Sequence, residues 1–143
     1  MVPKINRKFD ILNVLDVLYH ITDEKLFEQA IINICRLTNN NGFILITDLC
    51  RLENISSVEH VKFRSKEIYK TALEKNSAKL LEIYPLYFFL NRPLFGKIRI
   101  MILRKIGMKM DNLFAPIYYY LDKIFLSQKI SNLNLIVGKK IKS

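Results

Sequence analysis

The sequence has 143 residues, which is enough for one domain of ordinary size and too few for two. Half of the residues are apolar and a quarter are charged, a balance that is typical of a globular protein and argues against disorder. The unbroken apolar stretches are far shorter than the roughly 20 residues of a membrane-spanning helix. No apolar signal core follows the first basic residues, so we expect a cytoplasmic protein.

The net charge of +10 is concentrated in the last part of the chain. Residues 1–84 carry 12 basic and 11 acidic side chains, whereas residues 85–143 carry 11 basic and 2 acidic ones. Within this second part, residues 92–109 mix Lys and Arg with many Ile, Leu and Met side chains. This mixture is typical of a segment on an anionic membrane surface, and it also suits an insertion over a substrate pocket. No known recognition motif is present, so we expect no nucleic-acid partner.

The two cysteines, Cys35 and Cys50, form no CxxC pair. A metal centre or a disulfide framework needs more ligands at closer spacing. We therefore expect two buried, reduced thiols and no metal site.

The first half of the chain predicts a strand, a helix and a second strand. Residues 9–15 (FDILNVL) are mostly apolar with no helix cap before them, which indicates a buried strand. The run Thr22–Glu24 supplies a capping side chain and an acidic first turn for a helix. Its apolar stripe is Leu26, Phe27, Ala30, Ile31, Ile34 and Leu37. Asn39–Gly42 predicts the turn that stops this helix, and residues 43–47 (FILIT) predict the second strand.

The second half continues the alternation after a polar connection. Ser65 marks the start of a second helix, with an apolar face made of Ile68, Tyr69, Ala72 and Leu73. Residues 79–84 and 133–137 predict two further strands, and residues 115–126 predict a helix between them.

This order of elements predicts one domain built on a parallel sheet with helices on its faces. Its parts are residues 9–84, an insertion at 85–131 and a final strand within 132–138. Ligands bind beyond the carboxyl ends of the strands in such sheets, and these ends are Leu15–Asp16 and Thr47–Asp48. The two aspartates are candidates for ligand contact and, equally, for solvated turn or capping residues.

Three segments of the sequence together resemble a known family. They are FDILNVLDVLYHITDEKLFEQAI (9–31), NGFILITDL (41–49) and HVKFRS (60–65). In this order they are similar to the C-terminal half of a class I S-adenosylmethionine-dependent methyltransferase, with Asn40-Asn41-Gly42 where relatives usually have Pro-Gly-Gly. The resemblance implies an α/β, Rossmann-like three-layer sandwich that lacks its N-terminal strands.

The resemblance also implies roles for seven residues. The methionine part of the cofactor, S-adenosyl-L-methionine, is expected against Leu15 and Asp16 at the end of the first strand. His20 lies in the next loop, where a side chain that titrates near neutrality can act as a base or orient the acceptor. The residues expected on the acceptor side are Asp48, His60, Arg64 and Tyr69. A purely structural role, such as packing or helix capping, stays open for each of them.

The sequence departs from the family where cofactor binding begins. The family's glycine-rich loop lets the backbone approach the ligand, and an acid after its second strand holds the ribose. Here the four glycines, Gly42, Gly96, Gly107 and Gly138, are too far apart to form such a loop. We therefore expect the chain alone to bind the cofactor poorly.

Two functions fit these observations. The first is a methyltransferase-family half that is inactive alone, with an N-terminal half on a separate chain or a second copy paired through the Phe9–Leu15 edge. The alternative is a non-catalytic module that docks on a partner protein or, through residues 92–109, on an anionic membrane.

Overall fold

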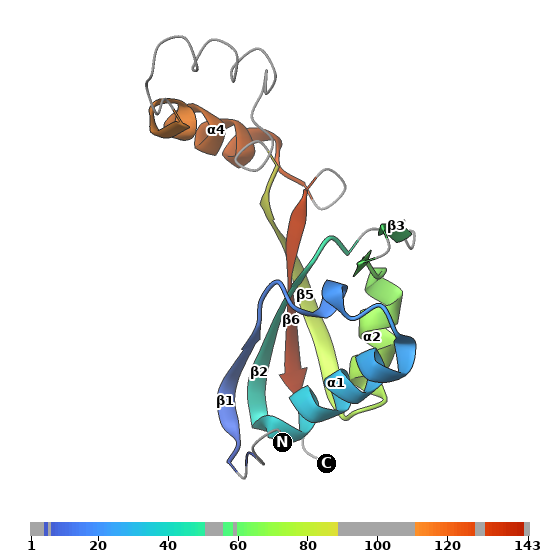
Figure 1. Ribbon diagram of the computed structural model, residues 1–143. Helices are drawn as coiled ribbons and strands as arrows, with labels where there is room; N and C mark the ends of the chain where they lie inside the picture. The colour runs from blue at the N-terminus through green and yellow to red at the C-terminus, as the bar shows by residue number, and fades with distance from the viewer. Residues whose placement is uncertain are drawn as a thin grey trace.

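Four strands form one mixed sheet in the computed structural model, which describes residues 5, 7–50, 56–58, 60–88, 111–127 and 131–141. In chain order they are β1 (Phe9–Val14), β2 (Thr38–Asp48), β5 (Ala78–Tyr87) and β6 (Leu133–Lys140). Their order across the sheet is β1-β2-β6-β5, and Figure 1 shows β1 at one edge. The four predicted strands are therefore confirmed.

The order of elements predicted a wholly parallel sheet, but the sheet is mixed. β1 and β2 run parallel, but β6 is antiparallel to both of its neighbours, β2 and β5. The chain leaves the carboxyl end of β5, forms helix α4 (Asp111–Phe125) beyond that end, and re-enters from there (Figure 1). A strand that enters from the carboxyl end must run against its neighbours, so the prediction was wrong for this strand.

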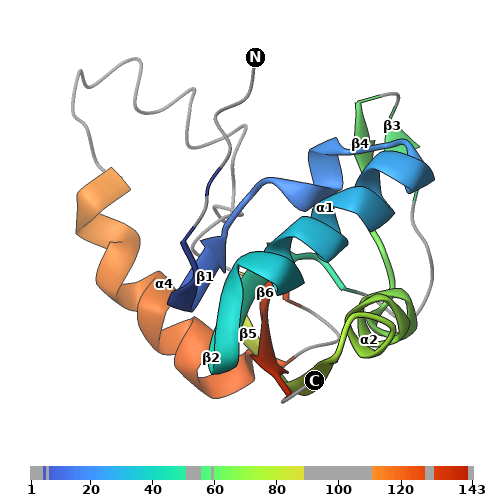
Figure 2. The same ribbon diagram turned by 90° about the horizontal axis from the view of Figure 1, so that it is seen from below.

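Two helices, α1 (Glu24–Leu37) and α2 (Lys66–Glu74), cover one face of the sheet. The predicted start of α1 is confirmed, because a carboxylate oxygen of Asp23 accepts a hydrogen bond from the Leu26 N–H at 2.9 Å. Phe27 and Ile31 of α1 are buried as predicted, whereas Leu26 is 64% exposed. Figure 2 shows the two helices beside each other over the strands.

The core lies between these helices and alternate residues of the strands. Its buried members include Val14, Phe27, Ile31, Ile44, Ile46, Tyr69, Leu73, Ile83 and Ile136. Both cysteines are buried, which confirms the predicted burial, and no disulfide joins them in the described residues. The α/β, Rossmann-like class predicted from the sequence is confirmed.

The opposite face of the sheet is uncovered within the described ranges. Ile11 pairs with Phe43, and Phe43 pairs with Lys139, so these side chains share that face. Ile11, Phe43 and Tyr84 are 59%, 40% and 47% exposed. The described residues therefore supply two layers, a sheet and one layer of helices, of the expected three-layer sandwich.

The predicted turn at Asn39–Gly42 forms a bulge inside β2. Phe9 pairs with Thr38 and Ile11 with Phe43, so four residues of β2 stand opposite Asp10 alone. Asn41 has a positive φ of 64°. A Cβ atom on Gly42 would lie 2.9 Å from the carbonyl oxygens of Asn39 and Asp10, so only glycine fits there.

The remaining described segments lie beyond the carboxyl end of the sheet. A short hairpin of β3 (Ser56–Val58) and β4 (Val61–Lys62) occupies part of the predicted connection. The helix predicted at 115–126 is confirmed as α4, which stands away from the body in Figure 1. The basic segment 92–109 lies outside the described residues. No helix in the described part is long and apolar enough to cross a membrane.

Candidate functional site

The ends of β1 and β2 are joined by a reciprocal pair of hydrogen bonds. The backbone N–H of Asp16 donates to Thr47 Oγ1 at 2.7 Å, and the Thr47 hydroxyl donates to Asp16 Oδ1 at 3.1 Å. Asp16 has a positive φ of 57°, a conformation that aspartate tolerates better than most residues. The pair turns the chain sharply away from the sheet and leaves Leu15 and Asp16 exposed at its carboxyl edge.

Two tyrosines, Tyr19 and Tyr87, interact with the Asp16 carboxylate. The Tyr19 hydroxyl hydrogen-bonds with it, and partial burial together with the Asp16 charge raises the pKa of Tyr19. Burial and the same charge also raise the pKa of Tyr87. Neither tyrosine was predicted from the sequence. Tyr19 lies three residues after Asp16, in η1 (Leu18–His20), whereas Tyr87 comes from the distant end of β5. The carboxyl edge of the sheet therefore carries the Asp16 carboxylate with the phenol groups of Tyr19 and Tyr87 near it.

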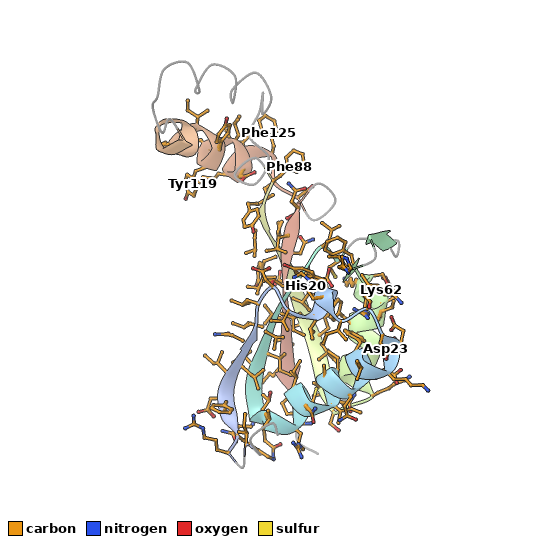
Figure 3. The ribbon with its side chains drawn as sticks, in the orientation of Figure 1. His20, Asp23, Lys62, Phe88, Tyr119 and Phe125 are labelled. Carbon is orange, nitrogen blue, oxygen red and sulfur yellow. The ribbon has the colours of Figure 1, made fainter. Side chains whose placement is uncertain are left out.

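His20 lies at this same edge. Its ring centre is 4.5 Å from that of Tyr19, and the side chain is exposed. Figure 3 shows His20 in the short segment that follows β1, with Asp23 and Lys62 to the same side of it. An exposed imidazole against a tyrosine that bonds a carboxylate has the groups that a base or an acceptor ligand needs. Leu15, Asp16 and His20 thus lie in one short segment at the carboxyl edge, and their roles stay a prediction.

Asp48 and Tyr69, expected on the acceptor side, are in the interior. The Tyr69 hydroxyl donates to Asp48 Oδ2, and both side chains are fully buried. Burial raises the pKa of Asp48, although the bond from Tyr69 and the backbone N–H groups of Leu49, Cys50 and Arg64 oppose this. Burial and the Asp48 charge raise the pKa of Tyr69. This arrangement joins β2 to α2 inside the core.

Arg64 is also interior, being 1% exposed. Its Nη2 donates to the carbonyl of Ile21 at 2.7 Å and to Glu24 Oε1 at 3.1 Å, and its Nη1 donates to the carbonyl of Leu18 at 3.3 Å. The guanidinium lies 3.8 Å from the centre of the Phe27 ring. Arg64 therefore fixes the loop that carries His20, from the inside.

Glu24 completes this clamp from the start of α1. Burial alone would raise the pKa of its carboxyl, but the cations of Lys62, 2.6 Å away, and Arg64 hold that pKa below its ordinary value. His60 lies apart from the clamp, exposed in the turn between β3 and β4. Substrate contact by Asp48, His60, Arg64 or Tyr69 stays a prediction.

The residues present do not form a complete site for S-adenosylmethionine. Leu15 and Asp16 offer a single wall, and the Asp16 N–H is already bonded to Thr47. The four glycines of the sequence form no loop that a ligand's ribose or methionine part could approach. Within the described ranges, no cluster of three or more His, Cys, Asp or Glu side chains could hold a metal ion.

No protein-family model and no curated protein matches the sequence. Solved structures do match the fold. The O-methyltransferase from a trans-AT PKS multienzyme of Brevibacillus brevis, in complex with S-adenosyl-L-homocysteine, matches with a TM-score of 0.59 at 15% identity, over 97% of this chain and 46% of its own. The N-methyltransferase NodS of Bradyrhizobium japonicum, in complex with the same compound, matches with a TM-score of 0.55 at 13% identity, over 99% of this chain and 50% of its own.

A third match shows that this fold serves more than one reaction. The [4+2]-cyclase SpnF matches with a TM-score of 0.57 at 12% identity, over 100% of this chain and 54% of its own. The chain therefore shares its fold with about half of each of these structures, two of which are methyltransferases, and the fold alone does not fix the chemistry. The chain spans about half the length of these structures.

Proposed function

We propose that this chain is the C-terminal half of a methyltransferase-type enzyme and becomes active only when a second half supplies the cofactor loop. The observation that carries this proposal is the difference in coverage between this chain and the solved structures that it matches. Nearly the whole of this chain aligns with only about half of each solved structure. The second half is encoded ahead of residue 1 or on a separate chain.

The uncovered surfaces of the sheet support this proposal. β1 has a neighbour on one side only among the described strands, and a free edge presents unpaired N–H and C=O groups. Ile11, Phe43 and Tyr84 expose apolar surface on the open face, which is costly in water. A second half that adds a strand beside β1 and helices on the open face would remove both costs.

The carboxyl edge would then supply the acceptor side of the completed site. S-adenosylmethionine, when bound by the second half, supplies the methyl group. His20 would orient the acceptor or remove its proton, and Asp16 would hold Tyr19 against the His20 ring. Arg64 would act indirectly, by fixing the loop through its bonds to Leu18 and Ile21.

Alanine variants of the two histidines of the sequence, His20 and His60, distinguish a catalytic role from a role in acceptor binding. In the completed enzyme, His20→Ala should lower kcat by roughly a hundredfold, as loss of a general base does, with little change in the cofactor Kd. His60→Ala, at the hairpin turn, should change the acceptor KM more than kcat. Unchanged turnover in His20→Ala would show that His20 is structural.

The proposal itself is tested at the gene. The reading frame ahead of the Met1 codon, or one beside it, should encode strand, glycine-rich loop, helix, strand and acid. Co-expression of that frame should yield a stoichiometric complex with this chain. A neighbouring sequence with no such pattern, together with a chain that alone is a monodisperse monomer, would contradict it.

Helix α4 favours a second candidate function, docking on an anionic membrane. Ile117, Tyr119, Tyr120, Ile124 and Phe125 are all exposed on this helix, and Figure 3 shows Tyr119 and Phe125 far from the body. Aromatic and aliphatic side chains next to a basic segment suit a membrane interface. Salt-sensitive co-sedimentation with phosphatidylserine vesicles, without any gain of cofactor binding from a second half, would favour this candidate.

A further inference from the structure

A basic hollow lies at the end of the sheet opposite the candidate site. It encloses about 420 Å³, and its lining includes Lys8, Arg36, Asn40, Lys75, Asn76 and Lys140. These residues come from the start of β1, the last turn of α1, the beginning of β2, the end of α2 and the end of β6. We call this group of residues the basal hollow. None of the residues that line it is acidic.

The cations of the basal hollow are largely unneutralised. In the described part of the chain, the side chains of Lys8, Arg36 and Lys75 make no hydrogen bond or ion pair. Lys140 Nζ donates to the Asn76 carbonyl at 2.8 Å, which orients its charge without cancelling it. Four cations therefore line one hollow, and an anion bound there would offset their mutual repulsion.

The turn that carries Lys75 and Asn76 is firmly built. Asn76 Nδ2 donates to the carbonyl of Ala72 at 2.8 Å, and the Ile141 N–H donates to the carbonyl of Ser77 at 2.9 Å. Ser77 has a positive φ of 54°. One rim of the hollow is therefore pre-formed, which lowers the entropic cost of binding.

A competing account is that these cations serve the helices alone. Arg36 and Lys75 stand at the C-terminal ends of α1 and α2, and each end carries the equivalent of about −0.5 charge. Two helix ends together offset about one of the four positive charges. Most of the positive charge remains, so helix ends do not account for the cluster.

We propose that the basal hollow binds a phosphate group. A guanidinium offers paired N–H donors that match phosphate oxygens, and the three lysines add point charges. The amides of Asn40 and Asn76 add neutral donors at the rim. The phosphate belongs to a small soluble ligand or to a lipid headgroup, and the site is independent of the proposed methyl transfer.

The test uses the full chain fused to a soluble carrier protein, with the carrier alone as a blank. Inorganic pyrophosphate is titrated by calorimetry at low salt, and vesicles of phosphatidylcholine with phosphatidic acid are tested by co-sedimentation. Arg36→Gln/Lys75→Gln is compared with Lys25→Gln/Lys70→Gln, which changes one cation on each of the same helices away from the hollow. Lys8→Gln is a milder variant outside any helix.

Pyrophosphate binding should weaken roughly 20-fold in Arg36→Gln/Lys75→Gln and about fivefold in Lys8→Gln, and it should stay within about twofold in the control pair. Binding of the vesicles but not of pyrophosphate, with the same order of variants, would assign the phosphate to a lipid. The proposal is overturned if neither probe binds, or if both pairs lose binding equally, which would reflect the net charge of +10 alone. A lower thermal stability of Arg36→Gln/Lys75→Gln with unchanged binding would likewise favour the helix-end account.

Discussion

Asp16 and Thr47 bind each other across the ends of two adjacent strands, 31 residues apart in sequence. The bond from the Asp16 N–H holds this aspartate in its left-handed conformation, and the returning bond aims its carboxylate. The Asp16 carboxylate hydrogen-bonds with Tyr19, and the Tyr19 ring packs on His20. The Thr47 hydroxyl therefore helps to fix the geometry of the whole candidate site.

Removing that hydroxyl should destabilise the fold measurably. Thr47 is buried, so Thr47→Val keeps the shape and leaves the Asp16 N–H without its partner, at a cost of about 1–2 kcal/mol in the free energy of unfolding. The matched control is Thr71→Val, an exposed position on α2, which should change it by less than about 0.5 kcal/mol. Urea denaturation measures both. Equal effects would show that the pair is incidental.

The buried Asp48 should make stability depend on pH. Because burial raises its pKa in the folded state, its stabilising contribution is fully present below the unfolded pKa of about 3.9 and is lost as pH rises through the raised folded value. Glu24, whose folded pKa is lowered, stabilises the fold at higher pH and loses this contribution as pH falls. The pH dependence of the parent's stability therefore contains both effects. The difference between the parent and Asp48→Asn isolates Asp48.

That difference is measured as the free energy of unfolding at a series of pH values from acid to neutral. Relative to the parent, Asp48→Asn should become progressively more favourable as pH rises. A difference that is flat across the series would mean that Asp48 is paired well enough to stay charged at no cost.

The β1 edge should drive self-association of the isolated chain. Ile11 is exposed on this strand, and the strand carries no proline and only Asp10 as a charge, so little opposes pairing with another edge. Ile11→Lys should shift the chain toward smaller species in light scattering. Leu26→Lys, on the exposed side of α1, should not. A parent chain that is a monodisperse monomer would refute this expectation.

Local signals in the sequence were sufficient for the elements themselves. The capping role of Asp23 follows from the chemistry of a single residue, which acts over a few positions. The turn predicted at Asn39–Gly42 to stop the helix is instead a bulge inside β2, because α1 already ends at Leu37 and the strand begins at Thr38. The burial of Phe27 and Ile31 follows from helical spacing. These features of the fold depend on interactions between residues that are only a few positions apart in the sequence.

Longer-range relations were not predictable in the same way. The place of β6 between β2 and β5 depends on where α4 returns the chain. Arg64 looks like a surface cation in sequence, yet it is buried because four oxygens and the Phe27 ring surround its guanidinium. The approach of Tyr87, at the end of β5, to Asp16 likewise joins segments with no shared local pattern.

The most direct test of the central claim is calorimetric titration of S-adenosylmethionine into the chain, first alone and then in complex with its second half. Alone, the chain has one wall of the site and no glycine-rich loop, so we predict no measurable heat of binding. In the complex, we predict saturable one-to-one binding. A low-micromolar Kd for the chain alone would contradict the account, because it would mean that these residues form a complete cofactor site without a second half.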